Sequence, residues 1–158
     1  MAGRYDHLFV RHMKECSDDL VNEGAVAGLP RPGNVGDPFA LMRSADVDLS
    51  QVHMAYSWIS ETDQQVHWVN DHEHDYDEVL MWMGNNPDDI HDLGAEIYLD
   101  IEGERHVITT TGSVYIPAGT RHCPLGFISV SRPFSFIALS LNGAYSSDEN
   151  VPSEVAAR

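Results

Sequence analysis

The sequence predicts an all-β protein built as an antiparallel double-sheet barrel. Residues 51–59 and 95–101 alternate apolar and polar side chains, which is the pattern of strands with one buried face. Turns rich in glycine and proline separate such segments, and no long segment repeats its apolar residues with the period of a helix. A chain of 158 residues is long enough for one domain with a sizeable core.

The predicted barrel covers residues 49–142, between an irregular amino-terminal arm (1–48) and a polar carboxyl-terminal tail (143–158). Glycine and proline dominate residues 24–38 of the arm, which favours turns over regular elements. We expect the arm to pack on the barrel or on a neighbouring subunit. Together with the open edges of the sheets, it favours a homodimer.

Along the chain, the first expected elements are a short strand over residues 8–10 and weak helical character over residues 14–22. The strand over residues 51–59 carries large apolar residues at alternate positions up to Trp58, which is therefore expected to face inward. His53 has the opposite parity and is expected at the surface or at a sheet edge. Further strands are expected over residues 95–101, 106–111, 114–116 and 134–141.

A histidine-rich segment contains most of a metal site. Side chains along a strand alternate between its two faces, so residues 72, 74, 76 and 78 can project to one side. This parity brings the imidazoles of His72 and His74 together with the carboxylate of Glu78. Tyr76 shares the parity and lies between them.

A second segment supplies a fourth ligand. The short apolar strand over residues 114–116 runs into a turn, Pro117-Ala-Gly119, which delivers His122 onto the start of the next strand. Two separate hairpins are then expected to supply one site.

The two segments resemble the paired motifs of the cupin superfamily. His-x-His-x3-Glu followed by Gly84 resembles the first motif, and Pro-x-Gly-x2-His resembles the second. The resemblance covers roughly residues 50–142. It implies a jelly-roll β-barrel with the metal ligands His72, His74, Glu78 and His122. A cupin pocket that has lost its metal is the alternative.

Three neutral imidazoles and one carboxylate suit one divalent transition-metal ion per chain. We favour Fe(II), although Mn(II), Ni(II) or Zn(II) would accept the same ligands. If the ion is six-coordinate, two positions stay open for substrate, water or dioxygen. Tyr76 and Glu78 are the candidate catalytic residues. The phenol of Tyr76 could act as an acid, a base or a hydrogen-bond donor, or it could only fill the barrel wall.

An aromatic lining is expected around the metal, which favours an organic substrate with apolar surface. The candidate substrate-binding residues are Trp58, Trp82, Phe134 and Phe136. The favoured function is a non-heme oxygenase of a small enolisable or aromatic compound. A non-redox lyase, isomerase or cyclase, in which the ion is a Lewis acid, is the alternative. A ligand-binding or sensing cupin without turnover is the third.

The charge of the chain argues against some partners. Its 25 acidic and 9 basic residues give a formal net charge of -16, which repels nucleic acid and anionic membrane surfaces. The two cysteines form no disulfide framework, and no apolar run approaches the ~18 residues of a membrane span. We therefore expect a cytoplasmic protein whose partner is a small-molecule substrate.

Overall fold

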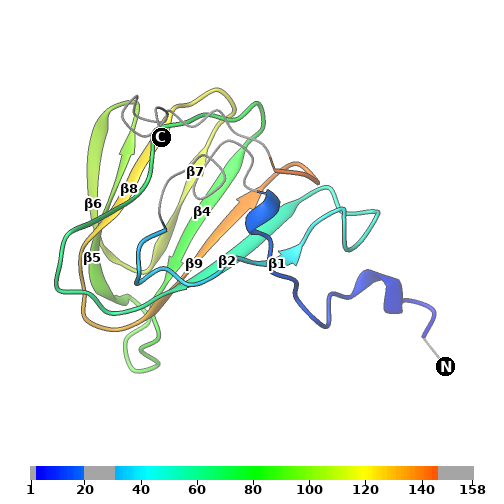
Figure 1. Ribbon diagram of the computed structural model, residues 1–158, viewed down its shortest axis with the longest axis horizontal. Helices are drawn as coiled ribbons and strands as arrows, with labels where there is room; N and C mark the ends of the chain where they lie inside the picture. Colours follow the sequence, from blue (N-terminus) through cyan, green and yellow to red (C-terminus); the bar gives the residue numbers. More distant parts are fainter. Residues whose placement is uncertain (1–2, 20–30, 146–158) are drawn as a thin grey trace.

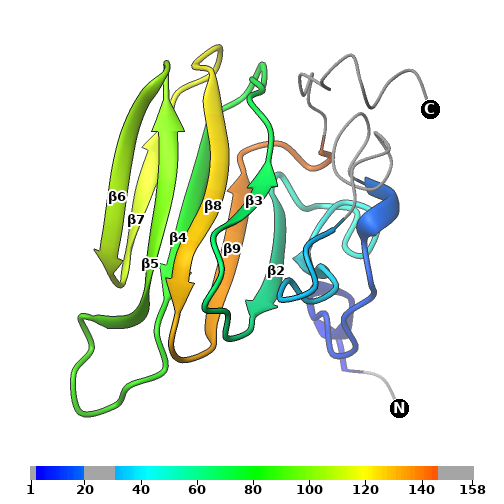
Figure 2. The same ribbon diagram turned by 60° about the vertical axis from the view of Figure 1, so that its left-hand side comes forward.

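The computed structural model describes residues 3–19 and 31–145. Two antiparallel sheets pack face to face, and the described residues form no α-helix (Figure 1, and turned by 60° in Figure 2). In the larger sheet the strands lie in the order β1 (Phe39–Met42), β2 (His53–Ile59), β9 (Phe134–Ser140), β4 (Glu78–Met83) and β7 (Gly112–Ile116). In the smaller sheet the order is β3 (Val66–Val69), β8 (His122–Val130), β5 (Asp92–Ile101) and β6 (Glu104–Thr110). The predicted all-β double-sheet fold is confirmed, although the described strands form an open sandwich and not a closed barrel.

The core lies between the two sheets, where inward side chains from both meet. Its fully buried residues include Phe127 on β8, Phe134 on β9, and Ile97 and Leu99 on β5. Burying a side chain of this size stabilises the fold by about 1.5–3 kcal/mol. The alternation in the sequence predicts that Ile97 and Leu99 share the inner face, and the structure confirms it.

The amino-terminal segment differs from the prediction. In place of the strand expected over residues 8–10, the chain forms a 3₁₀ turn, η1 (Asp6–Leu8). The N–H of Phe9 donates a hydrogen bond to the carbonyl of Asp6 (3.2 Å) and closes the turn. Leu8 and Phe9 stay exposed, so this segment has no buried apolar face to hold it in a sheet. Figure 1 shows it in dark blue, standing away from the sheets.

The chain joins the larger sheet earlier than predicted. Glu15 bridges Phe39, so the segment ahead of η2 (Ser17–Asp19) runs antiparallel to β1. Of the helical character expected over residues 14–22, only η2 is present in the described part, and residues 20–30 lie outside it. Strand β1 itself lies within the predicted arm, because it pairs with β2 and extends the sheet by one strand.

Parts of two predicted segments lie outside the described residues. These are residues 24–30 of the stretch rich in glycine and proline and residues 146–158 of the tail. Within the described part, no helix has the length and apolar character needed to cross a membrane.

Strand β2 turns the opposite face inward from the one predicted. Trp58, expected inside, is 47% exposed. His53, expected at the surface, is 3% exposed, and Ser57 on the same face is also buried. Both polar residues line a cavity between the sheets. Because the large apolar residues of this strand lie on the other face, the alternation pattern predicts the wrong side.

Candidate metal centre

His72 and His122 are brought together by the backbone. The N–H of His72 donates to the carbonyl of His122 (3.0 Å), and the N–H of His122 donates back to the carbonyl of His72 (2.9 Å). This reciprocal pair places the two ring centroids 4.3 Å apart. Two histidines that lie far apart in the sequence therefore form one side of the site.

The segment from His72 to Glu78 is not the regular strand that the sequence predicts. It bends at residues 75 and 76, and only Glu78 belongs to a strand, as the first residue of β4. The side chains at 72, 74, 76 and 78 are nevertheless all buried, as the predicted alternation requires. The inward side chains therefore come from a bent segment that enters β4.

The turn over residues 117–119 fixes the position of His74. The N–H of Gly119 donates to the carbonyl of His74 (2.7 Å). Gly119 has a φ of +76°, in the left-handed region that favours glycine. The turn therefore does two things: it leads the chain into β8 at His122, and it holds a ligand that belongs to the other segment.

Arg121 joins the same two segments through its side chain. Its Nε donates to the carboxylate of Asp71 (2.8 Å), and its Nη1 lies 3.8 Å from a carboxylate oxygen of Glu73. Both acids alternate with the histidines of the site along the chain. A partly exposed ion pair contributes about 1 kcal/mol or less, so we expect Arg121 to set the relative position of the segments more than their stability.

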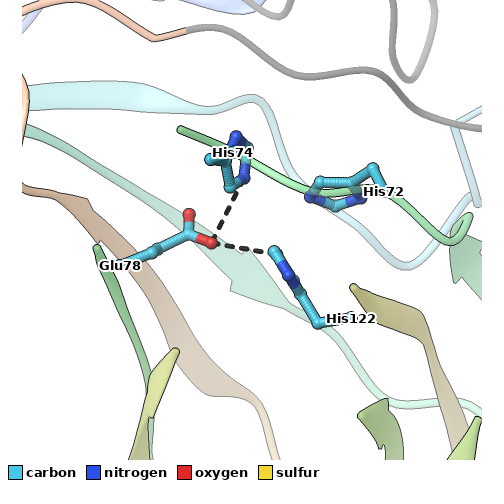
Figure 3. Close-up of side chains that lie close together, drawn as sticks. All are labelled: His72, His74, Glu78 and His122. Carbon is cyan, nitrogen blue, oxygen red and sulfur yellow. Dashed lines mark ion pairs between the residues drawn. The ribbon is translucent and has the colours of Figure 1, made fainter. Parts of the chain in front are cut away.

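The four predicted ligands converge on one point (Figure 3). One potential ligand atom from each of His72, His74, Glu78 and His122 lies within 4.8 Å of the others. Oε2 of Glu78 is 3.3 Å from Nε2 of His74 and 3.1 Å from Nε2 of His122. None of the four residues is more than 5% exposed. The predicted ligand set is therefore one buried cluster that could hold a metal ion.

Hydrogen bonds to the backbone orient two of the imidazoles as ligands. Nδ1 of His72 donates to the carbonyl of Asn70 (2.8 Å), and Nδ1 of His122 donates to the carbonyl of Thr120 (3.0 Å). A carbonyl oxygen only accepts hydrogen bonds, so each Nδ1 carries the proton. The Nε2 atom of each ring then presents a lone pair, as a metal ligand must.

Two atoms at the centre of the cluster show why a cation fits there. Nε2 of His122 and Oε2 of Glu78 are buried and make no hydrogen bond with any described residue. They lie 3.1 Å apart, and in a buried site two such atoms need a proton or a cation between them. A divalent ion that accepts nitrogen and oxygen ligands satisfies both atoms. The residues present therefore fit a metal ion.

Burial and the neighbouring imidazoles set the charge of the cluster. Burial, and then the nearby His122, lower the pKa of His72 from 6.5 to about 4. Burial alone would raise the pKa of Glu78, but the facing His122 and His74 outweigh it and lower this pKa from 4.5 to about 2. At neutral pH His72 is neutral and Glu78 is ionised, which are the states that metal binding requires.

No protein-family model matches the sequence, and no curated protein matches it. The structure is similar to the polyketide cyclase RemF from Streptomyces resistomycificus, with a TM-score of 0.51 and 12% identity over 80% of this chain and 79% of that one. It is also similar to a cupin-like protein from Thermotoga maritima (TM-score 0.48, 12% identity, 80% of this chain and 92% of that one). A cupin superfamily protein from Desulfitobacterium hafniense gives a TM-score of 0.45 and 13% identity over 72% of this chain and 82% of that one.

The two-sheet sandwich places both predicted motifs side by side at one buried site, in a fold similar to solved structures. This chain has the cupin fold.

A cavity of about 110 Å³ lies beside the ligand cluster. His72, Glu78 and His122 form part of its wall. His53 and Ser57 on β2 add further polar groups. The apolar part of the wall includes Trp68, Val69, Leu80, Leu125, Phe136 and Ala138. A molecule in the cavity would therefore meet an apolar surface and the ligand cluster at once.

Of the four aromatic residues predicted to bind substrate, one lines the cavity and three do not. Phe136 lines the cavity, whereas Phe134 and Trp82 are buried in the core outside it. Trp58 is exposed on the other face of β2. Trp68 on β3 also lines the cavity, and its ring centroid lies 5.2 Å from that of Phe136. The sequence does not predict Trp68 as a cavity residue, because β3 carries no motif. The cavity wall is therefore aromatic, but mostly through residues other than those predicted: Tyr56, Trp68 and Tyr145 line it beside Phe136.

Tyr76 contacts His74, one of the candidate metal ligands. Its ring stacks on that of His74, with centroids 4.9 Å apart and 15° between the planes. Tyr76 is 9% exposed, and it is not among the described residues that line the cavity. The stacking would hold the ring of His74 in place. Its catalytic role as an acid or base stays a prediction.

His53 is the cavity residue that the alternation pattern placed on the wrong face. One signal was available: His53 and Ser57 share a parity, so two polar residues lie on one face of a strand whose other face is apolar. Such a face suits a polar cavity as well as solvent, and the pattern alone does not separate the two.

Proposed function

We propose that this cupin is a metal-dependent enzyme that acts on a small organic substrate bound in the cavity. The observation that supports the proposal is that His72, Glu78 and His122 belong both to the ligand cluster and to the cavity wall. A substrate in the cavity would therefore lie beside the ion. Bound there, a divalent ion would act as a Lewis acid on a substrate oxygen, and Fe(II) would add redox chemistry.

The cavity limits the part of the substrate that it can enclose. An apolar cavity of about 150 Å³ binds benzene, and this cavity has about 110 Å³. The cavity is smaller than that one, which favours a small enolisable carbonyl compound as the substrate. Leu80, Leu125 and Phe136 in the wall would exclude water from the reacting group.

Within this class we favour an oxygenase that uses Fe(II). Three neutral imidazoles and one carboxylate on a divalent ion leave a net charge of about +1, which attracts an anionic substrate such as an enolate. Glu78 supplies the negative charge of the ligand set, and its lowered pKa keeps it ionised across the neutral range. An enolate is electron-rich, which favours its reaction with dioxygen.

A lyase, isomerase or cyclase that needs no oxidant is the second candidate, and one observation favours it. Such a reaction depends on a side chain that moves a proton. His53 provides an imidazole in the wall of the same cavity. A binding or sensing cupin without turnover is the third candidate, and neither this imidazole nor a complete ligand set is needed for it.

Metal analysis tests the centre itself. Protein purified without added metal is expected to carry a transition-metal ion, which Glu78→Ala should lose because the buried cluster then lacks its carboxylate. His106→Ala is the matched control, since His106 is an exposed histidine on β6, outside the cluster. A metal-free wild-type protein that takes up no ion on addition would reject the centre.

An oxygen-uptake assay then separates the two enzyme classes. Iron in the purified protein, with uptake that depends on a small enol or β-diketone and disappears in Glu78→Ala, supports the oxygenase. Zinc, with turnover that continues without oxygen, supports the lyase, isomerase or cyclase. Metal-loaded protein that turns over no compound in either assay would leave a binding protein and contradict the proposal.

A further inference from the structure

His53 shares a row of the larger sheet with Glu78. His53 on β2 pairs with Ser140 on β9, and Ser140 pairs with Glu78 on β4. Directly paired residues project to the same face, and all three are buried. Two strand spacings put the backbones of His53 and Glu78 roughly 10 Å apart. The two residues therefore line one cavity without being neighbours in it.

Asp19 on η2 fixes the ring of His53. Its Oδ2 lies 2.9 Å from Nε2 of His53. Burial alone would raise the pKa of Asp19, but the hydrogen bonds from His53 and Arg43 outweigh it and lower this pKa. Asp19 is therefore a carboxylate, which only accepts hydrogen bonds. Nε2 of His53 therefore carries a proton, and in the neutral ring Nδ1 presents a lone pair.

Arg43 holds this pair in turn. Its Nη1 donates to Asp19 (2.6 Å), and its Nε donates to Asp46 (2.6 Å). The side chain of Arg43 is only 12% exposed, so the two carboxylates fix its guanidinium in a fairly dry environment. The network joins the amino-terminal segment to β2. The amino-terminal segment, which carries no motif in the sequence, thus supports the cavity wall.

The second nitrogen of His53 has no partner in the described part of the chain. Its ring lines the cavity, and Nε2 is the atom that Asp19 holds. Nδ1 makes no hydrogen bond with any described residue, and the ring centroid of His53 lies 5.6 Å from that of Tyr145. A histidine that a carboxylate orients through one nitrogen, with the other nitrogen able to meet a substrate, is the arrangement of a general base.

We propose that His53 is a catalytic proton acceptor in this cavity and that Asp19 positions it. The proposal rests on the proposed function and specifies its substrate as a small carbonyl compound with a hydrogen on the adjacent carbon. Nδ1 takes that proton as the C–H bond breaks. The electron pair forms a carbon–carbon double bond, and the carbonyl oxygen becomes the enolate oxygen. The carboxylate of Asp19 stabilises the imidazolium until the proton is returned to carbon.

Hydrogen–deuterium exchange tests this step without knowledge of the natural substrate. Zinc-loaded protein is mixed with hydroxyacetone in D₂O, and the loss of the C–H signals is followed by proton NMR. The wild type is expected to accelerate the exchange over buffer. His53→Gln keeps a hydrogen-bonding side chain but no base, and should slow the catalysed exchange by about 100-fold or more. His106→Gln, the same change at an exposed histidine, should leave the rate unchanged.

The zinc content of each variant separates this proposal from the proposed function. His53→Gln should keep its zinc while it loses exchange, whereas His122→Ala should lose both. Exchange that is equal in the wild type and His53→Gln, or absent from both, overturns the role of His53. A wild type that binds no zinc overturns the metal centre instead, and exchange above buffer in that wild type but not in His53→Gln would still support the role of His53.

The role of Asp19 has its own readout. ¹⁵N shifts of labelled histidine report which ring nitrogen carries the proton, and wild-type His53 should be protonated at Nε2. Asp19→Asn should shift part of the population to the Nδ1 tautomer, because an amide can donate as well as accept. Asp46→Asn removes the other carboxylate on Arg43 and should leave the tautomer of His53 unchanged. An unchanged tautomer in Asp19→Asn would overturn the positioning role.

Discussion

Acidification is expected to destabilise the metal-free protein through His72. Burial and the neighbouring His122 lower the pKa of His72 from 6.5 to about 4 in the folded state. Unfolding exposes the ring and restores the ordinary pKa. Between these two values the unfolded chain binds a proton at His72 that the folded protein does not, so the free energy of unfolding falls as the pH falls.

The magnitude follows from the two pKa values. A change from 6.5 to about 4 corresponds in total to about 3 kcal/mol, at about 1.4 kcal/mol for each pH unit. Nothing is lost well above pH 6.5, and the loss is complete below about pH 4. Integrated from pH 7 to pH 5, the expected loss from this one residue is about 2 kcal/mol.

Urea denaturation, followed by tryptophan fluorescence, measures this loss. The metal-free wild type and His72→Gln are unfolded at pH 7 and at pH 5. Glutamine is polar and does not titrate, so the wild type should lose about 2 kcal/mol more than the variant over this range. His106→Gln, a change at an exposed histidine, should follow the wild type. The difference between variants cancels the contribution of the many other titrating groups.

An equal pH dependence in the wild type and His72→Gln would refute the reasoning, because it would mean that His72 titrates alike in both states. Added zinc provides a second check. A ligated imidazole cannot take up a proton unless the ion leaves, and the ion stabilises the folded state by its binding. Zinc-loaded protein should therefore keep its stability to lower pH than metal-free protein.

Three further outcomes are expected. Elemental analysis of His122→Ala should show metal loss as complete as in His72→Ala, because the two residues form one cluster, and full occupancy in either variant would contradict this. Gly84→Ala should lower the free energy of unfolding by about 3 kcal/mol, because the added Cβ would clash with the carbonyl oxygen of Asp92. An unchanged thermal midpoint would speak against that clash. Sedimentation at micromolar concentration should detect a homodimer, and a single 17.6 kDa species would reject the pairing.

The ligand cluster could be predicted because each half of it is encoded by local spacing. The parity of residues 72 to 78 survives in the structure even though the segment bends, since burial still alternates there. The short turn that ends in Gly119 limits where His122 can lie. The spacing does not predict the reciprocal backbone pairing of His72 with His122, because that pairing forms only when the two segments pack together.

The rest of the site depends on contacts that no local pattern encodes. Which face of β2 turns inward is decided by the cavity, whose wall accepts His53, and not by the larger apolar residues such as Trp58. Asp19 reaches the site only because η2 packs near β2. Residues at functional sites often depart from the pattern that predicts the core, and β2 is such a case.

The position of β9 affects how the protein can be made. Strand β9 comes last along the described chain, yet it lies between β2 and β4 in the larger sheet, as Figure 1 shows in orange. Until residues 134–140 have left the ribosome, β2 and β4 each present an unpaired edge, and such edges invite association with other chains. His53 and Glu78 stand on opposite sides of that gap. A nascent chain should therefore fold late and be most prone to aggregation just before its last strand is inserted.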